Sequence, residues 1–331
     1  MIPWHLEVLP RNAVLVCGVF FLCPQGGRAE FVVPGYVVET YAEVADPIEL
    51  AFDSLGNLFV GRDNSGSGGS QVGPAKIHRI APDGTVTEWG AEALSDPDVV
   101  AVDTSGAITG TPNSVLVGQR VSTTTGRVRF IKPDQSISVL FSTTQFNNIA
   151  GFGFDSSGSL LVQGLFTPDI LRYDTNATLT VLVEQSGRGV NLQTDGAGLI
   201  YSATGSPGTY DGRVRIFSEA GVLVDDAYLT GLDGFRSNFN YLGQSPWGSG
   251  LLGVHSNGEL AHYDLTGAKT SIGTGFSQTP SVVLGPDGAY YLSDFTNDRV
   301  LRVAPVPEPD SLLVLLSLWV LTIIRRGRRD R

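Results

Sequence analysis

The stretch PSVVLGPDGAYYLSDFTNDRVLRVAP, residues 280–305, carries the clearest fold signal in the chain. Two apolar runs flank a turn at Asp287–Gly288, and a third apolar run begins at Arg299. An Asp-Gly pair supplies the positive-φ residue that a tight hairpin needs, so the stretch predicts three antiparallel strands. No fourth strand of this kind follows, because the chain enters a Pro-Glu-Pro segment directly after Val306.

Similar units recur along the chain at spacings of roughly 40 to 52 residues. Aspartates anchor the first turns of four other units, at Asp53, Asp103, Asp155 and Asp195. A weaker unit at 241–273 keeps the hairpin pattern without that aspartate, and most units continue with a third and a fourth apolar run, as at 76–84 and 85–90. Six four-stranded units predict an all-β, six-bladed β-propeller. A β-sandwich or a β-helix is the alternative, although the coils of a β-helix are shorter.

The last unit lacks a fourth strand, whereas the segment YVVETYAEV at 36–44 belongs to no unit. We expect this N-terminal segment to become the outer strand of the sixth blade, paired with residues 299–303. Such pairing would close the ring and remove both free sheet edges.

The N-terminus predicts a secretory signal peptide with a signal helix within residues 1–29. Arg11 precedes an apolar run at 13–23, and the small-x-small sequence at 27–29 predicts cleavage between Ala29 and Glu30. A buried N-terminal helix is the alternative. Both cysteines of the chain lie in this segment, so the mature chain would have no disulfide and no thiol nucleophile.

The C-terminus predicts a membrane helix followed by a basic end. An uncharged, mostly apolar run of fourteen residues occupies 311–324. As a helix it would span roughly 21 Å, and snorkelling arginine stems would help it to reach across a hydrocarbon core of about 30 Å. Five arginines follow, at Arg325, Arg326, Arg328, Arg329 and Arg331. The positive-inside rule keeps them cytoplasmic and places the body of the protein outside.

Together with Pro307, Glu308 and Pro309, these parts stand in the order of a PEP-CTERM sorting signal, which the tail resembles. The resemblance implies an exosortase-type membrane enzyme as partner, cleavage near the motif, and release to, or attachment at, the cell surface. An ordinary single-span anchor is the alternative. We therefore expect a signal peptide at 1–29, a propeller at 30–305 and a sorting tail at 306–331, in a protein exported across the inner membrane of a Gram-negative-type bacterium.

The propeller units resemble NHL and streptogramin-lyase repeats, most clearly in KIHRIAPDGTVTEW at 76–89 and in RVLRVAP at 299–305. The resemblance implies the fold and leaves the activity open, because such repeats serve many functions. The formal net charge of −11 argues against a nucleic-acid partner, since phosphate binding needs a basic surface. The two trimmed ends are net positive, so the mature body would be more acidic still.

Three connections between second and third strands look long, and they predict a binding face. They span Arg62 to Ala75, Thr109 to Gly126, and Thr204 to Gly212. Flexible insertions are the alternative. His78 and His262 fall in third strands, where a histidine usually faces a neighbouring side chain. The streptogramin-lyase resemblance would ask for a His/Glu pair in the late blades, but a turn at 257–258 separates His255 from Glu259, so we assign no catalytic residue.

Loop acids are the other candidates for chemistry. Oxygen ligands for calcium occur at Asp63-Asn64, at Asp211, and at Asp294 with Asn297-Asp298. None of these forms an EF-hand pattern, and solvated loop acids are the alternative. Gluconolactonase-like propellers need a glutamate early in the first blade, where this chain has Ile48 followed by Glu49, so that site is not transferred. We therefore expect no metal and no cofactor, with Ca²⁺ as the remaining candidate.

Two functions remain open. The first is a non-enzymatic surface or matrix protein that binds a glycan, matrix component or protein through its loop face. The alternative is a secreted, metal-assisted propeller lyase or lactonase. Three acidic or histidine side chains that converge at the channel mouth would favour the enzyme. A purely structural matrix component cannot be separated from the first function at this level.

Overall fold

The structure is a computed structural model that describes residues 31–306, apart from 64–73, 186, 207–208, 233–239, 243–244, 256, 278 and 280. The predicted signal peptide, its cleavage site and the sorting tail from Pro307 onward lie outside these residues. The described part is β-structure with a single 3₁₀ turn at Phe295–Asn297, and it contains no helix long and apolar enough to span a membrane. The all-β class is confirmed, while the two flanking helices gain no support.

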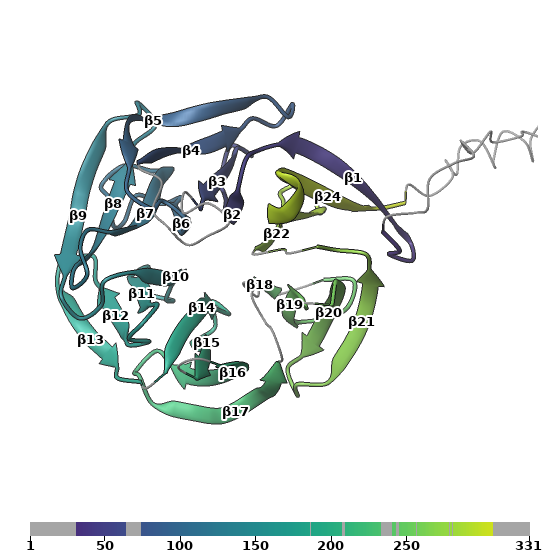
Figure 1. The fold of residues 1–331 in the computed structure, drawn as a ribbon. Coiled ribbons are helices and arrows are strands. Elements are labelled where there is room, and N and C mark those ends of the chain that lie inside the picture. Colours follow the sequence, from purple (N-terminus) through teal and green to yellow (C-terminus); the bar gives the residue numbers. More distant parts are fainter. Residues whose placement is uncertain are drawn as a thin grey trace, which may run out of the picture. The chain divides into compact units, whose positions relative to one another are not determined.

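The strands form six four-stranded sheets arranged as the blades of a propeller (Figure 1). In chain order, the first blade contains β2 (Pro47–Phe52), β3 (Leu58–Arg62), β4 (Ala75–Ile80) and β5 (Val86–Leu94). The second blade contains β6 (Val100–Asp103), β7 (Ser114–Arg120), β8 (Gly126–Ile131) and β9 (Ile137–Thr143). The third blade contains β10 (Ile149–Phe154), β11 (Leu160–Gly164), β12 (Ile170–Tyr173) and β13 (Leu179–Val183). The fourth blade contains β14 (Arg188–Thr194), β15 (Leu199–Ser206), β16 (Thr209–Ser218) and β17 (Leu223–Leu232). The fifth blade contains β18 (Asn240–Leu242), β19 (Gly250–Val254), β20 (Glu259–Asp264) and β21 (Lys269–Thr274). The sixth blade contains β22 (Val282–Leu284), β23 (Tyr290–Asp294), β24 (Arg299–Pro305) and, as its outer strand, β1 (Tyr36–Glu43). The first strand of each blade lies at the centre of the ring and the last at its rim.

The predicted ring closure is confirmed. β1 pairs antiparallel with β24, so that Val37 lies opposite Ala304 and Thr40 lies opposite Leu301. The same N-terminal segment also reaches the fifth blade, because Val32 forms a two-way backbone bridge with Thr274 at the end of β21. The chain continues from β1 directly into β2, so the segment that contains Val32 and β1 ties the last two blades to the first.

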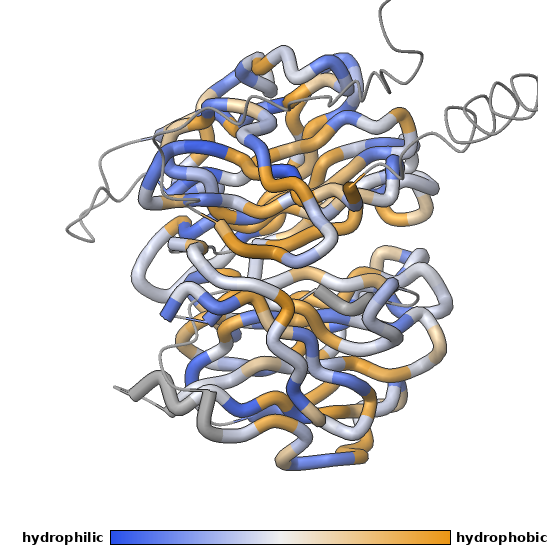
Figure 2. Tube along the Cα trace, turned by 90° about the vertical axis from the view of Figure 1, so that its right-hand side faces the viewer, coloured by the Kyte–Doolittle hydropathy of each residue, from blue (hydrophilic) through white to orange (hydrophobic). Residues whose placement is uncertain are grey.

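The hydrophobic core is divided into six clusters, and each lies between two neighbouring blades. The period-2 alternation of the strands produces this arrangement. In β3, for example, Leu58 and Val60 pack toward the sixth blade while Phe59 packs toward the second. Figure 2 shows the result along the trace, where hydrophobic stretches alternate with hydrophilic ones.

Two of the three predictions of a long loop between second and third strands are wrong. The stretch from Thr109 to Gly126 contains the strand β7 at Ser114–Arg120. The long connection lies instead before this strand, between β6 and β7. There the Asp103 carboxylate accepts hydrogen bonds from the backbone N–H groups of Gly106, Ile108 and Thr109. The stretch at 204–212 is mostly strand, since β15 and β16 continue until Ser206 pairs with Thr209. The connection from Arg62 to Ala75 lies largely outside the described residues.

Candidate functional site

The two faces of the propeller carry different polar groups. One face, which we call the turn face, holds the turns from inner to second strands and from third to outer strands. The opposite face, which we call the inter-blade face, holds the loops from second to third strands and from one blade to the next. Each face must therefore be considered separately as a candidate site.

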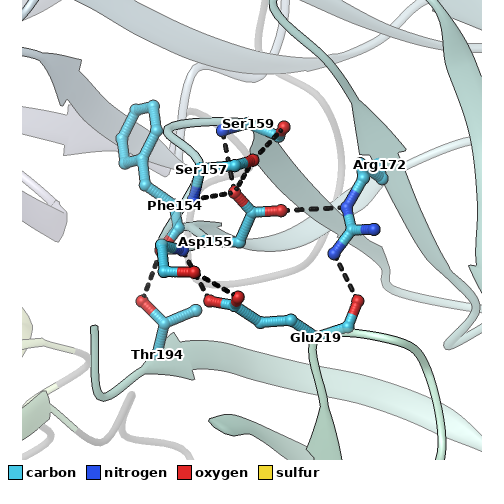
Figure 3. Close-up of polar contacts among 8 residues, drawn as sticks. Phe154, Asp155, Ser157, Ser159, Arg172, Thr194 and Glu219 are labelled. Carbon is cyan, nitrogen blue, oxygen red and sulfur yellow. Dashed lines mark hydrogen bonds and ion pairs between the residues drawn. The ribbon is translucent and has the colours of Figure 1, made fainter. Parts of the chain in front are cut away.

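On the turn face, the anchoring aspartates have partners. Figure 3 shows Asp155, whose carboxylate accepts bonds from Ser157 and from the Ser159 backbone and pairs with Arg172 Nε at 2.9 Å. Arg172 also donates to the backbone carbonyl of Glu219 in the next blade. Asp287 is held in the same way by Arg302, at 2.8 Å. These acids stabilise turns, and their hydrogen-bonding capacity is used for that purpose.

On the inter-blade face, two matching Asp-Pro turns lead into the inner strands of the first and second blades. They lie at 45–47 and 95–97. Asp46 and Asp96 both adopt the left-handed backbone region, with φ of 50° and 52°. Few residues other than glycine adopt this region, although aspartate is among those that tolerate it best. The turns are thus a repeated local structure that fixes where each aspartate lies.

The end of β3 connects these two turns. The Arg62 backbone N–H donates to the Pro97 carbonyl at 2.9 Å, and Arg62 Nε donates to the Ala45 carbonyl at 3.0 Å. The next residue, Asp63, donates its backbone N–H to the Asp46 carbonyl at 3.1 Å. Asp63 is therefore held between the two Asp-Pro turns.

Glu49 and Asp98 lie beside this junction. The Glu49 backbone N–H donates to the Asp98 carbonyl at 3.2 Å. The Glu49 side chain is 8% exposed, and its Oε1 accepts a bond from the Ser281 hydroxyl at 3.3 Å across the junction with the sixth blade. The Oδ1 atom of Asp98 is fully buried and has no hydrogen-bond donor among the described residues. We refer to Asp46, Glu49, Asp63, Asp96 and Asp98 as the acidic cluster.

Burial and mutual repulsion raise pKa values in the acidic cluster. Burial raises the pKa of Asp98 well above its ordinary value, and the nearby carboxylates of Asp96, Asp63 and Glu49 raise it further. Burial and Asp63 also raise the pKa of Asp96, although Arg120 opposes this shift. A raised pKa favours the protonated form of a carboxyl group, which is the form that can act as a general acid, and such groups are common at functional sites.

The acidic cluster does not by itself match a metal site. Among the described residues, no three His, Cys, Asp or Glu side chains lie close enough together to hold a metal ion. The described part of the chain thus lacks the three converging acidic or histidine side chains that would favour a metal-assisted enzyme. A resident divalent cation does not fit these side chains alone, because such ions need several oxygen ligands at short range.

The other predicted calcium candidates are used differently. Asp294 is completely buried, and it accepts bonds from Arg299 Nε at 2.8 Å and from Asn297. Asp298 accepts the Asp46 backbone N–H at 2.9 Å. The side chains of Asn64 and Asp211 lie outside the described residues. Asp294 therefore has a structural role in the turn after β23.

The histidines occupy the predicted elements. His78 lies in β4 and His262 in β20, both third strands. His255 follows β19, and its Nε2 lies 2.6 Å from the Tyr263 hydroxyl. Glu259 instead forms an ion pair with Lys269 at 2.7 Å. The His255 and Glu259 side chains thus bind different partners.

The sequence contains a signal for the acidic cluster that lies outside the turn motifs. The segments ADPIEL at 45–50 and SDPDVV at 95–100 repeat Asp-Pro at the entry of two inner strands. The repeat places Asp98 where the first copy has Ile48. A comparison of the entries of inner strands, rather than of their turns, would have selected Asp98.

No known family model matches the chain, and no curated protein matches its sequence. Solved structures match its fold. A gluconolactonase from Xanthomonas campestris has a TM-score of 0.64 at 12% identity, covering 82% of this chain and 90% of its own. A streptogramin B lyase gives 0.54 at 8%, covering 81% and 97%. An auxiliary nutrient binding protein from Bacteroides thetaiotaomicron gives 0.58 at 11%, covering 81% and 76%. At such identities these structures share the propeller fold with this chain.

Proposed function

We propose that the chain is an exported propeller enzyme, a lactonase or lyase, that acts at the acidic cluster on its inter-blade face. The observation that carries the proposal is the Asp98 carboxyl group. Its Oδ1 is buried without a donor, its pKa is raised by burial and by neighbouring carboxylates, and it lies beside a second acid, Glu49. The enzyme names of two similar propellers agree with this proposal.

Two neighbouring acids supply the two proton transfers that such reactions need. In lactone hydrolysis, Glu49 takes a proton from the water that attacks the carbonyl carbon. The ring C–O bond breaks, and Asp98 gives its proton to the leaving oxygen. In an elimination, Glu49 takes the proton from the carbon next to a carbonyl, and Asp98 protonates the group that leaves. The Ser281 hydroxyl orients Glu49 by donating to Oε1. No step is assigned to a metal ion, because the described side chains do not fit one.

The test uses purified mature protein and a panel of sugar and aliphatic lactones, with acid release as the readout. Asp98→Asn and Glu49→Gln should each lower kcat/KM by about 10²- to 10⁴-fold, the usual contribution of an acid or base. Asp134→Asn is the matched control, because Asp134 lies in an exposed turn on the opposite face and bonds Ser136. The absence of turnover by the unmodified protein, or full activity in Asp98→Asn, would contradict the proposal.

A second candidate is a non-enzymatic binding protein of the cell surface or matrix. It is favoured by the lack of three converging acids or histidines among the described residues, and by the likeness to a nutrient binding protein. Saturable glycan or matrix binding, weakened by Asp98→Asn and unaccompanied by turnover of the lactone panel, is the result that would select it.

For both candidates we propose export by the N-terminal signal and sorting by an exosortase-type enzyme. The proposal is supported by the order of the motif, apolar run and arginines at 307–331. Mass spectrometry of the protein from its host should find a chain that begins at Glu30 and ends near Pro309. Full-length tail peptides in the surface fraction would indicate a simple anchor.

A further inference from the structure

We propose that the inter-blade face of the second and third blades binds a neutral carbohydrate, with the Phe166 ring as the surface on which a sugar ring stacks. This site is separate from the acidic cluster, and the inference concerns binding rather than a reaction. It can therefore be tested whether or not the protein turns anything over.

Three segments that connect strands on this face contain no charged residue. They are VSTTT at 121–125, TTQFN at 143–147 and LFTP at 165–168. Most of their side chains carry a hydroxyl or an amide, and both groups donate and accept hydrogen bonds. The segments expose Val121, Ser122, Thr123, Thr124, Thr144, Gln145 and Phe166. In a chain with a net charge of −11, such a surface matches an uncharged ligand that is rich in hydroxyl groups.

Phe166 adds an apolar platform to these polar groups. It is 49% exposed, and it is the one exposed aromatic residue among those whose burial the structure describes. The Arg188 guanidinium lies 5.0 Å from the centroid of the ring, and this contact restrains the ring. A pyranose presents a face of C–H groups that stacks on an aromatic ring, while its hydroxyls remain available to hydrogen-bonding groups nearby.

Hydrogen bonds between loops hold the three segments in place. Asn147 Nδ2 donates to the Thr123 carbonyl at 2.8 Å and ties the second segment to the first. The Leu165 N–H donates to the Asn148 carbonyl at 2.9 Å, and the Leu165 carbonyl accepts the Gly189 N–H at 2.8 Å. The aromatic platform thus follows a residue that is bonded to the entries of the third and fourth blades. Groups that are ordered in advance lose less entropy when a ligand binds.

Phe146 brings the first and third segments to one place. This residue is 3% exposed, and its carbonyl accepts the N–H of Gly126, which directly follows the first segment, at 2.8 Å. Its ring also fills the space beside Gly164, which directly precedes the third segment, because a Cβ there would lie 2.6 Å from the ring. Both segments therefore border the same buried residue. One oligosaccharide can contact the hydroxyls of the first segment and the platform of the third.

The same surface is unsuited to other classes of ligand. A partner recognised through charge would find no charged side chain in the three segments. A protein partner would need a larger apolar centre, whereas Val121 and Phe166 are the large apolar side chains that these segments expose. The combination of one platform and many neutral polar groups is what distinguishes a carbohydrate from these partners.

An array of neutral oligosaccharides of glucose, galactose, mannose and N-acetylglucosamine tests the inference, followed by isothermal titration with the strongest array ligand. We expect saturable binding with the same affinity at low and high salt, because no ion pair contributes. Phe166→Ala should weaken binding about ten- to a hundredfold, whereas Phe166→Trp should retain it. Leu265→Ala is the matched control and should bind normally, because Leu265 is 54% exposed but lies in a turn on the opposite face.

Failure to bind any member of the array, or unchanged affinity in Phe166→Ala, would overturn the inference. Thermal unfolding checks each variant, and we expect Phe166→Ala to fold because the ring is half exposed. Self-association in analytical ultracentrifugation that disappears in Phe166→Ala, without array binding, would replace the carbohydrate by a second copy of the chain.

Asp98→Asn separates this site from the acidic cluster. Array binding should persist in that variant, and loss of binding there but not in Phe166→Ala would assign the carbohydrate to the acidic cluster instead. Lactone turnover without array binding would leave the proposed reaction standing and refute this inference. Array binding without turnover of the lactone panel would give the reverse result.

Discussion

Among single residues, buried polar groups divide into those with partners and those without. Asp294 is completely enclosed, yet Arg299, Asn297 and Ser277 all donate to it. Asp98 and His262 each keep a buried atom without a partner among the described residues. Because an unpaired buried group destabilises the folded state, such residues identify where ligand binding or pH can change stability.

His262 should make stability depend on pH. The side chain is 2% exposed, and burial lowers its pKa from the ordinary value of 6.5. The imidazole of His262 is therefore protonated more readily in the unfolded chain than in the folded protein. The unfolding free energy should then fall as the pH drops below 6.5. This decrease in unfolding free energy should reach at most about 1.4 kcal/mol per pH unit. Urea unfolding of the protein and of His262→Gln between pH 7.5 and 5 measures it, and identical slopes for both proteins would contradict the assignment.

Among strands and loops, the close approach of neighbouring blades is the recurrent feature. The loop at 96–98 lies directly against the end of β3, where the Arg62 N–H bonds the Pro97 carbonyl. Gly61 permits this contact, since any Cβ there would lie 2.2 Å from the Asp98 carbonyl oxygen. The position of the acidic cluster thus depends on a glycine in a neighbouring strand.

Gly61→Ala should destabilise the protein by about 1–3 kcal/mol, the usual range for overpacking a filled interior. Gly153→Ala is a milder comparison, because its new methyl group would meet the Thr194 side chain at 3.1 Å rather than backbone. Urea unfolding of both variants gives the two values. A smaller effect of Gly61→Ala than of Gly153→Ala would show that the loop yields easily.

Local turn chemistry made most of the fold predictable. Asp-Gly and Asp-x-x-Gly turns predicted the hairpins, and the missing strand after Pro305 predicted the role of 36–44. The long turn after Asp103 hid β7, because its apolar run was read as loop. The acidic cluster could not be predicted in the same way, since it brings Asp63 and Asp98 together from two blades. In the sequence, only the repeated Asp-Pro pairs indicate the acidic cluster.

For the molecule as a whole, the ring depends on one long-range pairing. β1 pairs with β24, and Arg302 of β24 bonds Glu39 of β1 at 2.8 Å and Asp287 at 2.8 Å. Outer strands elsewhere pair with strands close by in sequence, so this sheet is the place where the ring can open.

A disulfide between Val37→Cys and Ala304→Cys should therefore raise the unfolding free energy by about 2–4 kcal/mol. The two residues are direct partners across the strands, and the body between 30 and 306 contains no other cysteine. Urea unfolding with and without reductant measures the gain, and Val37→Cys alone is the control. A bridge that forms fully and leaves the unfolding midpoint unchanged would show that the ring does not open first.

The pairing of β1 with β24 also orders the steps of folding. Residues 36–43 are synthesised early, but their partner at 299–305 emerges only after nearly all of the chain. Contacts between distant segments form slowly, because a long loop must close before they are made. A chain that stops before Arg299 keeps an unpaired edge, and such an edge readily recruits another molecule. We therefore expect the chain to associate with other molecules less readily once β24 has been synthesised and has paired with β1.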